Sequence, residues 1–163
     1  MIGRDGELRL IQSALSAARD GHGGAVFLIG EAGIGKSRLA AAAADEAFAA
    51  GMTIMRGRGS SIGPMVPFRS LTEALMSLLR SRPGLDVSAL GPYRPVLARL
   101  VPDWGAPSLG EDSGSLVVLA ESVLRLTALA GAEGGCLLVL DDLQDSDAET
   151  LAVTEYLSDN LTA

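Results

Sequence analysis

The sequence predicts an α/β fold in which helices cover both faces of a mostly parallel β-sheet, in three αβα layers. Three short apolar runs suited to strands, at residues 25–29, 52–56 and 136–140, alternate with stretches whose apolar residues recur at helical spacing. Parallel strands require a crossover between them, which a helix usually provides. The chain has 163 residues, of which 48 % are hydrophobic and 20 % charged, so we expect one folded domain.

The first predicted elements surround a glycine-rich segment. Helical spacing of apolar residues over 5–19 predicts an amphipathic helix, which ends in the Gly-rich turn at 20–24. The continuous apolar run at 25–29 is typical of a strand that is buried on both faces. An alanine-rich stretch at 36–50 predicts a helix that leads to the second strand at 52–56.

The middle of the chain is predicted to be less regular. Ser70 and Glu73 have the spacing of a capping box, which predicts the start of a helix after the second strand. Residues 81–114 contain five of the seven prolines. We therefore interpret this stretch as an irregular insertion with at most one short helix, at about 96–101.

The last elements follow the same alternation. Apolar residues at helical spacing predict a helix at 116–130, and the run at 136–140 predicts a third buried strand. Ser146 and Glu149 have the spacing of a second capping box. They predict a last helix that runs to about residue 160.

Composition and charge argue against several partners. The chain has 13 Lys and Arg against 20 Asp and Glu, a net charge of −7, and no basic stripe. We therefore expect no direct nucleic-acid binding by this segment. No apolar run approaches the roughly 18 residues of a membrane helix, so we expect no membrane contact. Residues 1–5 lack a signal-peptide start and Cys136 is the single cysteine, which predicts a cytoplasmic location.

Residues 30–37 match the phosphate-binding pattern G-x-x-x-x-G-K-[ST] and lie between a predicted strand and a predicted helix. The glycines allow backbone torsions that turn successive N–H groups inward and form an anion nest at a positive helix end. Lys36, the only lysine, would reach the β- and γ-phosphates, and Ser37 would offer its hydroxyl to Mg²⁺. The predicted nucleotide-binding residues of this P-loop are Gly30, Glu31, Ala32, Gly33, Ile34, Gly35, Lys36, Ser37 and Arg38.

Two aspartates follow the third predicted strand. Asp141 and Asp142 stand at its carboxyl end, the edge where ligands bind in open α/β sheets. Taken alone, an apolar run that ends in Asp-Asp is also a turn signal. Paired with the P-loop, it predicts that Asp141 holds Mg²⁺ through water and that Asp142 orients or activates the attacking water. Lys36 and Asp142 are thus the predicted catalytic residues, and Ser37 and Asp141 the predicted metal ligands.

The two motifs together are similar to those of a known family. Residues 30–39, GEAGIGKSRL, and residues 137–144, LLVLDDLQ, resemble the P-loop and Walker B strand of STAND-type, AAA-like ATPase domains in large ATP-binding LuxR-type transcriptional regulators. The resemblance covers nearly the whole chain, and residues 2–8 resemble the family's opening GR-x-x-EL box. In that family the second motif continues Trp-Ala-Asp, whereas here only Asp147 of residues 145–147 matches.

The resemblance implies a P-loop NTPase fold of the ASCE type and binding of ATP or ADP with Mg²⁺. It also implies that Ile2, Gly3 and Arg4 lie near the adenine. In this class the strand that follows Walker B inserts between the P-loop strand and the Walker B strand, and the sequence ends before any such strand. We therefore expect a partial domain, truncated after the Walker B strand and its following helix, from a longer parent polypeptide.

A sheet without that strand would leave buried backbone groups unpaired. We expect the central gap to be bridged by direct contact of the two flanking strands or by exchange between copies, which would make the chain self-associate.

These expectations leave several functions open. The leading one is a switch module that binds ATP or ADP with Mg²⁺, with or without slow hydrolysis, in a signalling or transcriptional regulator. The alternatives are an ATP-driven motor or phosphotransferase, and the ATPase module of a protein that carries a nucleotide cyclase or kinase domain. A fragment that binds no nucleotide tightly is the remaining alternative.

Overall fold

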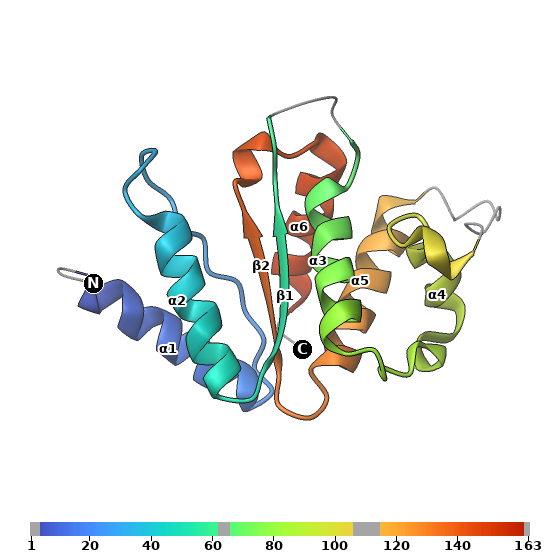
Figure 1. Ribbon diagram of the computed structural model, residues 1–163, viewed down its shortest axis with the longest axis horizontal. Helices are drawn as coiled ribbons and strands as arrows, with labels where there is room; N and C mark the ends of the chain where they lie inside the picture. The colour runs from blue at the N-terminus through green and yellow to red at the C-terminus, as the bar shows by residue number, and fades with distance from the viewer. Residues whose placement is uncertain (1–3, 62–65, 106–114, 162–163) are drawn as a thin grey trace.

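A two-stranded parallel sheet forms the middle layer of the computed structural model, which describes residues 4–61, 66–105 and 115–161. Strand β1 (Thr53–Arg58) pairs with β2 (Cys136–Asp141), so that Thr53 lies opposite Cys136 and Arg58 opposite Asp141. Figure 1 shows helices on both sides of these strands, which confirms the predicted αβα fold class. The helices are α1 (Asp5–Arg19) and α2 (Lys36–Ala49) on one side, and α3 (Arg69–Ser81), α5 (Leu116–Ala130) and α6 (Ala148–Asn160) on the other.

Alternate side chains of the two strands belong to different hydrophobic cores. Met55, Leu138 and Leu140 join the larger core with α3, α5 and α6, whereas Ile54 and Leu137 pack against the smaller core under α1 and α2. This follows from the period of two along a strand, which sends successive side chains to opposite faces. The largest fully buried side chains of the helices in the larger core are Leu71, Leu75, Leu78, Leu97, Leu119, Val123, Leu126 and Val153.

The predicted insertion at 81–114 contains more helix than expected. The 3₁₀-helix η1 (Val87–Tyr93), the short helix α4 (Arg94–Leu97) and the 3₁₀-turn η2 (Pro102–Trp104) follow one another, so the single short helix expected at 96–101 is misplaced. The stretch is ordered by burial, because Leu90 and Leu97 enter the larger core. Residues 106–114 of the predicted insertion lie outside the described residues.

Helix α3 covers the outer edge of β1. The backbone N–H of Arg56 donates to Ser77 Oγ (2.8 Å), and the backbone N–H of Arg58 donates to Glu73 Oε2 (3.0 Å). An edge strand with unpaired backbone groups is a template for pairing with another chain. These two bonds satisfy two outward-facing donors of β1, toward its carboxyl end, and leave them no free pairing with another strand.

The segment at 25–29 does not form the buried strand that its sequence predicts. Among the described residues β2 pairs with β1 alone, and residues 25–29 belong to neither strand of the sheet. Val26, Phe27 and Ile29 are 52 %, 59 % and 93 % exposed. We predicted that the P-loop strand at 25–29 would contact the Walker B strand, β2, directly. That prediction is therefore wrong for this structure. An isolated strand has no partner for its backbone groups, so an apolar run alone does not make one.

Both predicted capping boxes are also wrong. Helix α3 begins after Phe68 rather than at Ser70, because Glu73 is engaged with β1 and is not free to cap. Helix α6 has Asp147, not Ser146, as its N-cap residue. For α3 the predicted capping residue is engaged by a distant element, whereas for α6 the cap is a local one that lies one residue later than predicted.

Asp147 joins the starts of two helices. Its carboxylate accepts hydrogen bonds from Thr150 N–H (2.9 Å), Thr150 Oγ1–H (2.6 Å) and Phe68 N–H (3.0 Å), and the residue is only 5 % exposed. Burial acts to raise the pKa of Asp147, but the hydrogen bonds from Thr150 and Phe68 outweigh it and hold the pKa below its usual value. The carboxylate thus ties α6 to α3 beside the end of the sheet.

Replacing Asp147 with Ala should lower the free energy of unfolding by about 2–3 kcal/mol, because a helix cap is lost and the Phe68 N–H is left buried without a partner. Urea denaturation, monitored by circular dichroism, measures this change in the free energy of unfolding. Asp86 is a matched control, since it caps η1 through Ser88 N–H but is exposed. Asp86→Ala should destabilise by less than about 1 kcal/mol, and equal losses in the two variants would contradict this account.

The same carboxylate predicts a pH dependence. Folding lowers the pKa of Asp147, so its ionised form stabilises the fold at pH values above its unfolded pKa of about 3.9. This contribution is lost as the pH falls through the folded pKa. The stability difference between the wild type and Asp147→Asn, measured by urea titration, should therefore shrink below about pH 4. A difference that is constant from pH 7 to pH 3 would exclude the carboxylate as its source.

Candidate nucleotide-binding site

The P-loop at 30–37 keeps its predicted geometry although the segment before it is unpaired. Gly33 and Gly35 have φ values of 78° and 98°, in the left-handed region that favours glycine. Gly35 is the N-cap residue of α2, which has no side-chain cap and no acidic residue in its first turn. The first N–H groups of α2 and its positive dipole end therefore face the loop, where an anion would satisfy them.

Lys36 lies across this loop. Its Nζ donates hydrogen bonds to the carbonyl oxygens of Gly30 (2.8 Å) and Glu31 (3.0 Å). The ammonium is thus held over the concave side of the glycine-rich turn, on backbone acceptors that a phosphate can replace. Gly30, Glu31, Ala32, Gly33, Ile34, Ser37 and Arg38 are all exposed around it. The predicted loop residues therefore come together as one accessible cradle.

Arg4 connects the start of α1 to the P-loop. Its Nη2 donates to the carbonyl oxygen of Ile34 (2.5 Å), and its Nη1 lies 3.6 Å from Glu7 Oε1. The predicted position of Arg4 near the adenine stays a prediction, while the structure places its guanidinium on the loop backbone. Ile2 and Gly3, predicted with it, lie outside the described residues.

Ser37 and Asp141 reach the same pocket from two elements. Ser37 begins α2 and Asp141 ends β2, and both line a cavity of about 180 Å³ between α2 and the strands. A hydroxyl and a carboxylate are the hard oxygen donors that Mg²⁺ prefers, so the residues present fit this ion. Within residues 4–61, 66–105 and 115–161, no group of three or more His, Cys, Asp and Glu is placed to hold a metal. The pair suits an ion that keeps water and phosphate ligands.

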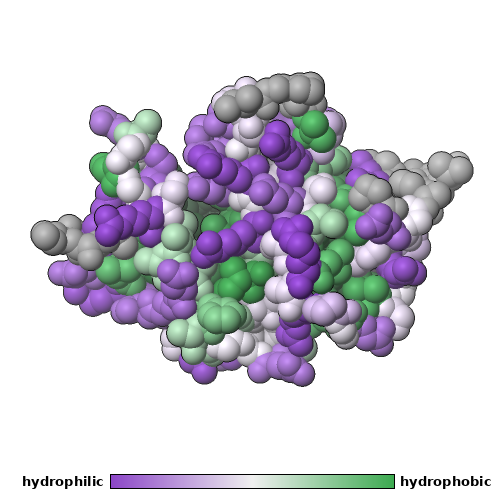
Figure 2. Space-filling model, viewed as in Figure 1, coloured by the Kyte–Doolittle hydropathy of each residue, from purple (hydrophilic) through white to green (hydrophobic). Residues whose placement is uncertain are grey.

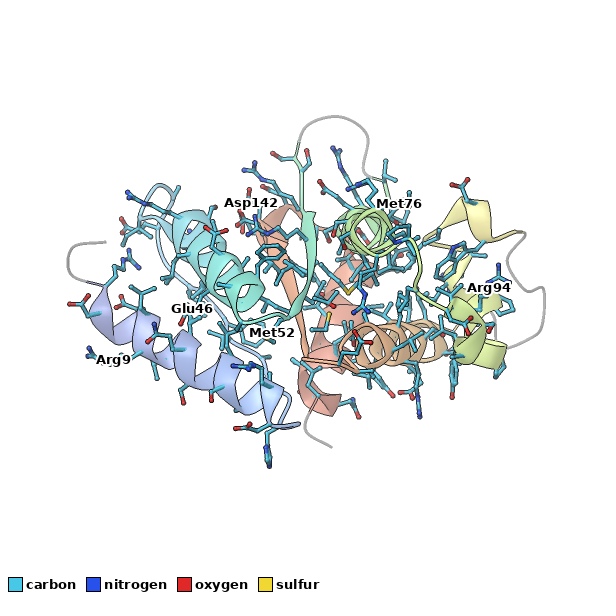
Figure 3. All side chains as sticks on the ribbon, turned by 60° about the horizontal axis from the view of Figure 1, so that its bottom comes forward. Arg9, Glu46, Met52, Met76, Arg94 and Asp142 are labelled. Carbon is cyan, nitrogen blue, oxygen red and sulfur yellow. The ribbon has the colours of Figure 1, made fainter. Side chains whose placement is uncertain are left out.

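Asp142 is held by a residue that the sequence analysis missed. Its Oδ2 accepts hydrogen bonds from Arg58 Nη2 (2.6 Å) and Nε (2.7 Å), and its Oδ1 accepts one from Gln144 Nε2 (3.1 Å). The bonds from Arg58 and Gln144 hold the pKa of Asp142 below its usual value. Figure 3 shows Asp142 at the end of β2. A clue in the sequence was that Arg58 follows the second predicted strand, whose carboxyl end meets the same edge.

The surface around these groups is hollowed, and both apolar and polar residues line the hollow. Figure 2 shows a recess between the part of the molecule formed by α1 and α2 and the part that contains the sheet. The polar residues that line the cavity here are Ser37, Arg56, Arg58, Glu73 and Asp141. Both charge signs are present: the arginines belong to β1, and the carboxylates come from α3 and β2. The recess therefore offers cations for phosphate and oxygen donors for a metal ion on adjoining walls.

Comparison with known proteins gives one finding. A family model described as an AAA ATPase domain matches residues 1–163, the whole chain. No curated protein and no solved structure gives a significant match. Among the described residues, no helix is both long and apolar enough to cross a membrane. The family description and the P-loop geometry agree on a nucleotide-binding module.

Replacing Gly35 with Ala should destabilise the fold by about 1–2 kcal/mol, because a φ of 98° is strained for any residue with a Cβ. An added Cβ would meet no atom within 4 Å, so the effect would come from torsion alone. Urea denaturation measures it. Gly6→Ala is the control: its Cβ also meets nothing, and inside α1 it should stabilise by up to about 1 kcal/mol. Two shifts of the same sign would contradict the torsional explanation.

Proposed function

The chain belongs to the AAA ATPase domain family, and from that premise we propose that it is an ATP/ADP switch module of a larger signalling or transcriptional regulator. The observation that carries the proposal is the meeting of Lys36, Ser37 and Asp141 around the glycine-rich loop and its adjoining cavity. A cationic side chain, a helix N-terminus and two oxygen donors converge there from α2 and β2. This combination serves phosphate and Mg²⁺ together.

Each residue has a part in the proposed binding. The N–H groups of the loop and the Lys36 ammonium hold the phosphates, while Ser37 and Asp141 hold Mg²⁺. When bound, Mg²⁺ neutralises charge on the phosphate oxygens. Asp142 is the base or orienting group for an attacking water, but Arg58 and Gln144 engage it in this structure.

The regulator context rests on the resemblance of the P-loop and Walker B segments to those of STAND-type LuxR regulators. The net charge of −7 supports a module that leaves nucleic acid to other parts of its parent polypeptide. Exposed Val26, Phe27 and Ile29 support contact with further polypeptide, either from the parent chain or from a second copy. In this proposal the nucleotide state changes the shape of a larger assembly.

Replacing Lys36 with Ala should weaken the binding of ATP and of ADP at least about tenfold, because the ammonium over the loop is lost. Isothermal titration calorimetry with Mg²⁺ present measures both affinities. Arg9→Ala removes an equal charge from an exposed position on α1 and should leave both affinities unchanged. Absence of binding to the wild type would reject the switch in favour of a fragment that binds no nucleotide.

Replacing Asp141 with Asn should remove the dependence of ATP affinity on Mg²⁺, because the carboxylate of the metal pair becomes a neutral amide. In the wild type, Mg²⁺ should tighten ATP binding several-fold, at least about threefold. Calorimetry with and without Mg²⁺ gives the ratio for each variant. Asp145→Asn is the control, since Asp145 lies nearby but does not line the cavity. If Mg²⁺ tightens ATP binding as much in Asp141→Asn as in the wild type, the metal ion binds elsewhere.

A further inference from the structure

Arg58 stands at the end of β1 with its side chain in the same cavity as Ser37 and Asp141. Its guanidinium contacts Asp142 through two nitrogens, Nη2 at 2.6 Å and Nε at 2.7 Å, and both reach the same oxygen, Oδ2. The Arg58 side chain is nevertheless 67 % exposed, and that of Asp142 is 22 % exposed. A cation directed at the phosphate-binding edge is therefore held by an acceptor at the surface.

This ion pair can exchange partners at little cost. Pairs that are exposed to water contribute little stability, since solvent screens the charges. Asp142 would keep one partner after the loss of Arg58, because Gln144 Nε2 donates to the other carboxylate oxygen, Oδ1 (3.1 Å). The guanidinium is a planar fork that matches a phosphate as well as a carboxylate, and bonds to phosphate are strong. A phosphate in the cavity would thus compete directly for Arg58.

The neighbouring cations differ from Arg58 in this respect. Lys36 is held by two carbonyl oxygens of the loop at the start of α2. Arg56, two residues before Arg58 on the same face of β1, lies 3.9 Å from Asp45 on α2 and is farther from the carboxyl end of the sheet. Arg58 is the one of these three that is bound to the carboxylate proposed to act on water.

Building on the proposed function, we propose that Arg58 determines specificity for nucleoside triphosphates: it leaves Asp142 and binds the terminal phosphate that a diphosphate lacks. With a diphosphate, Arg58 stays on Asp142. With a triphosphate, the carboxylate is released beside the place where water would attack. The position of the Arg58 side chain thereby depends on the number of phosphates, and its movement changes the contacts of Asp142 at the end of β2.

The test is the ratio of ATP to ADP affinity, measured by calorimetry with Mg²⁺. Arg58→Ala should weaken ATP binding about tenfold and leave ADP binding within about twofold. Arg125→Ala, the matched control, breaks a similarly exposed ion pair with Glu121 on α5 (2.6 Å) outside the cavity, and should leave both affinities within about twofold of the wild type. Arg58→Lys keeps the charge without the fork and should give an intermediate ratio. Circular dichroism confirms that each variant is folded.

A double-mutant cycle supplies a second readout that a purely structural role would not move. Asp142→Asn weakens the competing acceptor, so it should tighten ATP binding when Arg58 is present and have a smaller effect in the Arg58→Ala background. Equal effects in the two backgrounds, or equal loss of ATP and ADP binding in Arg58→Ala, would overturn the proposal while the nucleotide switch stands. A wild type that binds neither ATP nor ADP would overturn both the nucleotide switch and the role of Arg58. The failure of the Arg58 proposal alone is therefore distinguishable from the failure of the proposed function.

Discussion

The parallel register of β1 on β2 is the constraint on which the site depends. It places Arg58 opposite Asp141, so the carboxyl ends of both strands deliver their polar residues to one edge. Because successive side chains alternate, the same register sends Met55 and Leu138 into the larger core and Asp141 toward α2 and Ser37. A shift of β2 by one residue would turn the Asp141 carboxylate away from the P-loop and a leucine toward it.

The P-loop and the sheet are built in different ways. The loop owes its shape to the torsions of two glycines, the bonds of Lys36 to loop carbonyls and the contact of Arg4 with Ile34. None of these requires a paired strand at 25–29, which explains why the cradle is formed beside an exposed apolar segment. The sheet, in contrast, is closed on its β1 side by α3, whereas its β2 side has no partner strand among the described residues.

What the sequence could predict follows from how local each feature is. The helices at 5–19 and 116–130, the P-loop and the pair of aspartates are encoded within a few residues of themselves, and they were predicted with nearly correct boundaries. Features that depend on a distant partner were missed. The run at 25–29 has the composition of a buried strand but no partner strand in this structure, and Glu73 binds β1 instead of capping α3. The role proposed for Arg58 depends on the pairing of β1 with β2, which brings its side chain to Asp142.

The central claim is that Lys36, Ser37 and Asp141 form one site for a nucleotide phosphate and its metal. A crystal structure of the chain with Mg²⁺ and a non-hydrolysable ATP analogue tests it most directly. This account predicts triphosphate density in the loop at 30–37, in contact with Lys36 Nζ, and a metal ion between Ser37 Oγ and the Asp141 carboxylate. Analogue bound outside that loop, or a metal ion with neither residue in its coordination shell, would contradict the account.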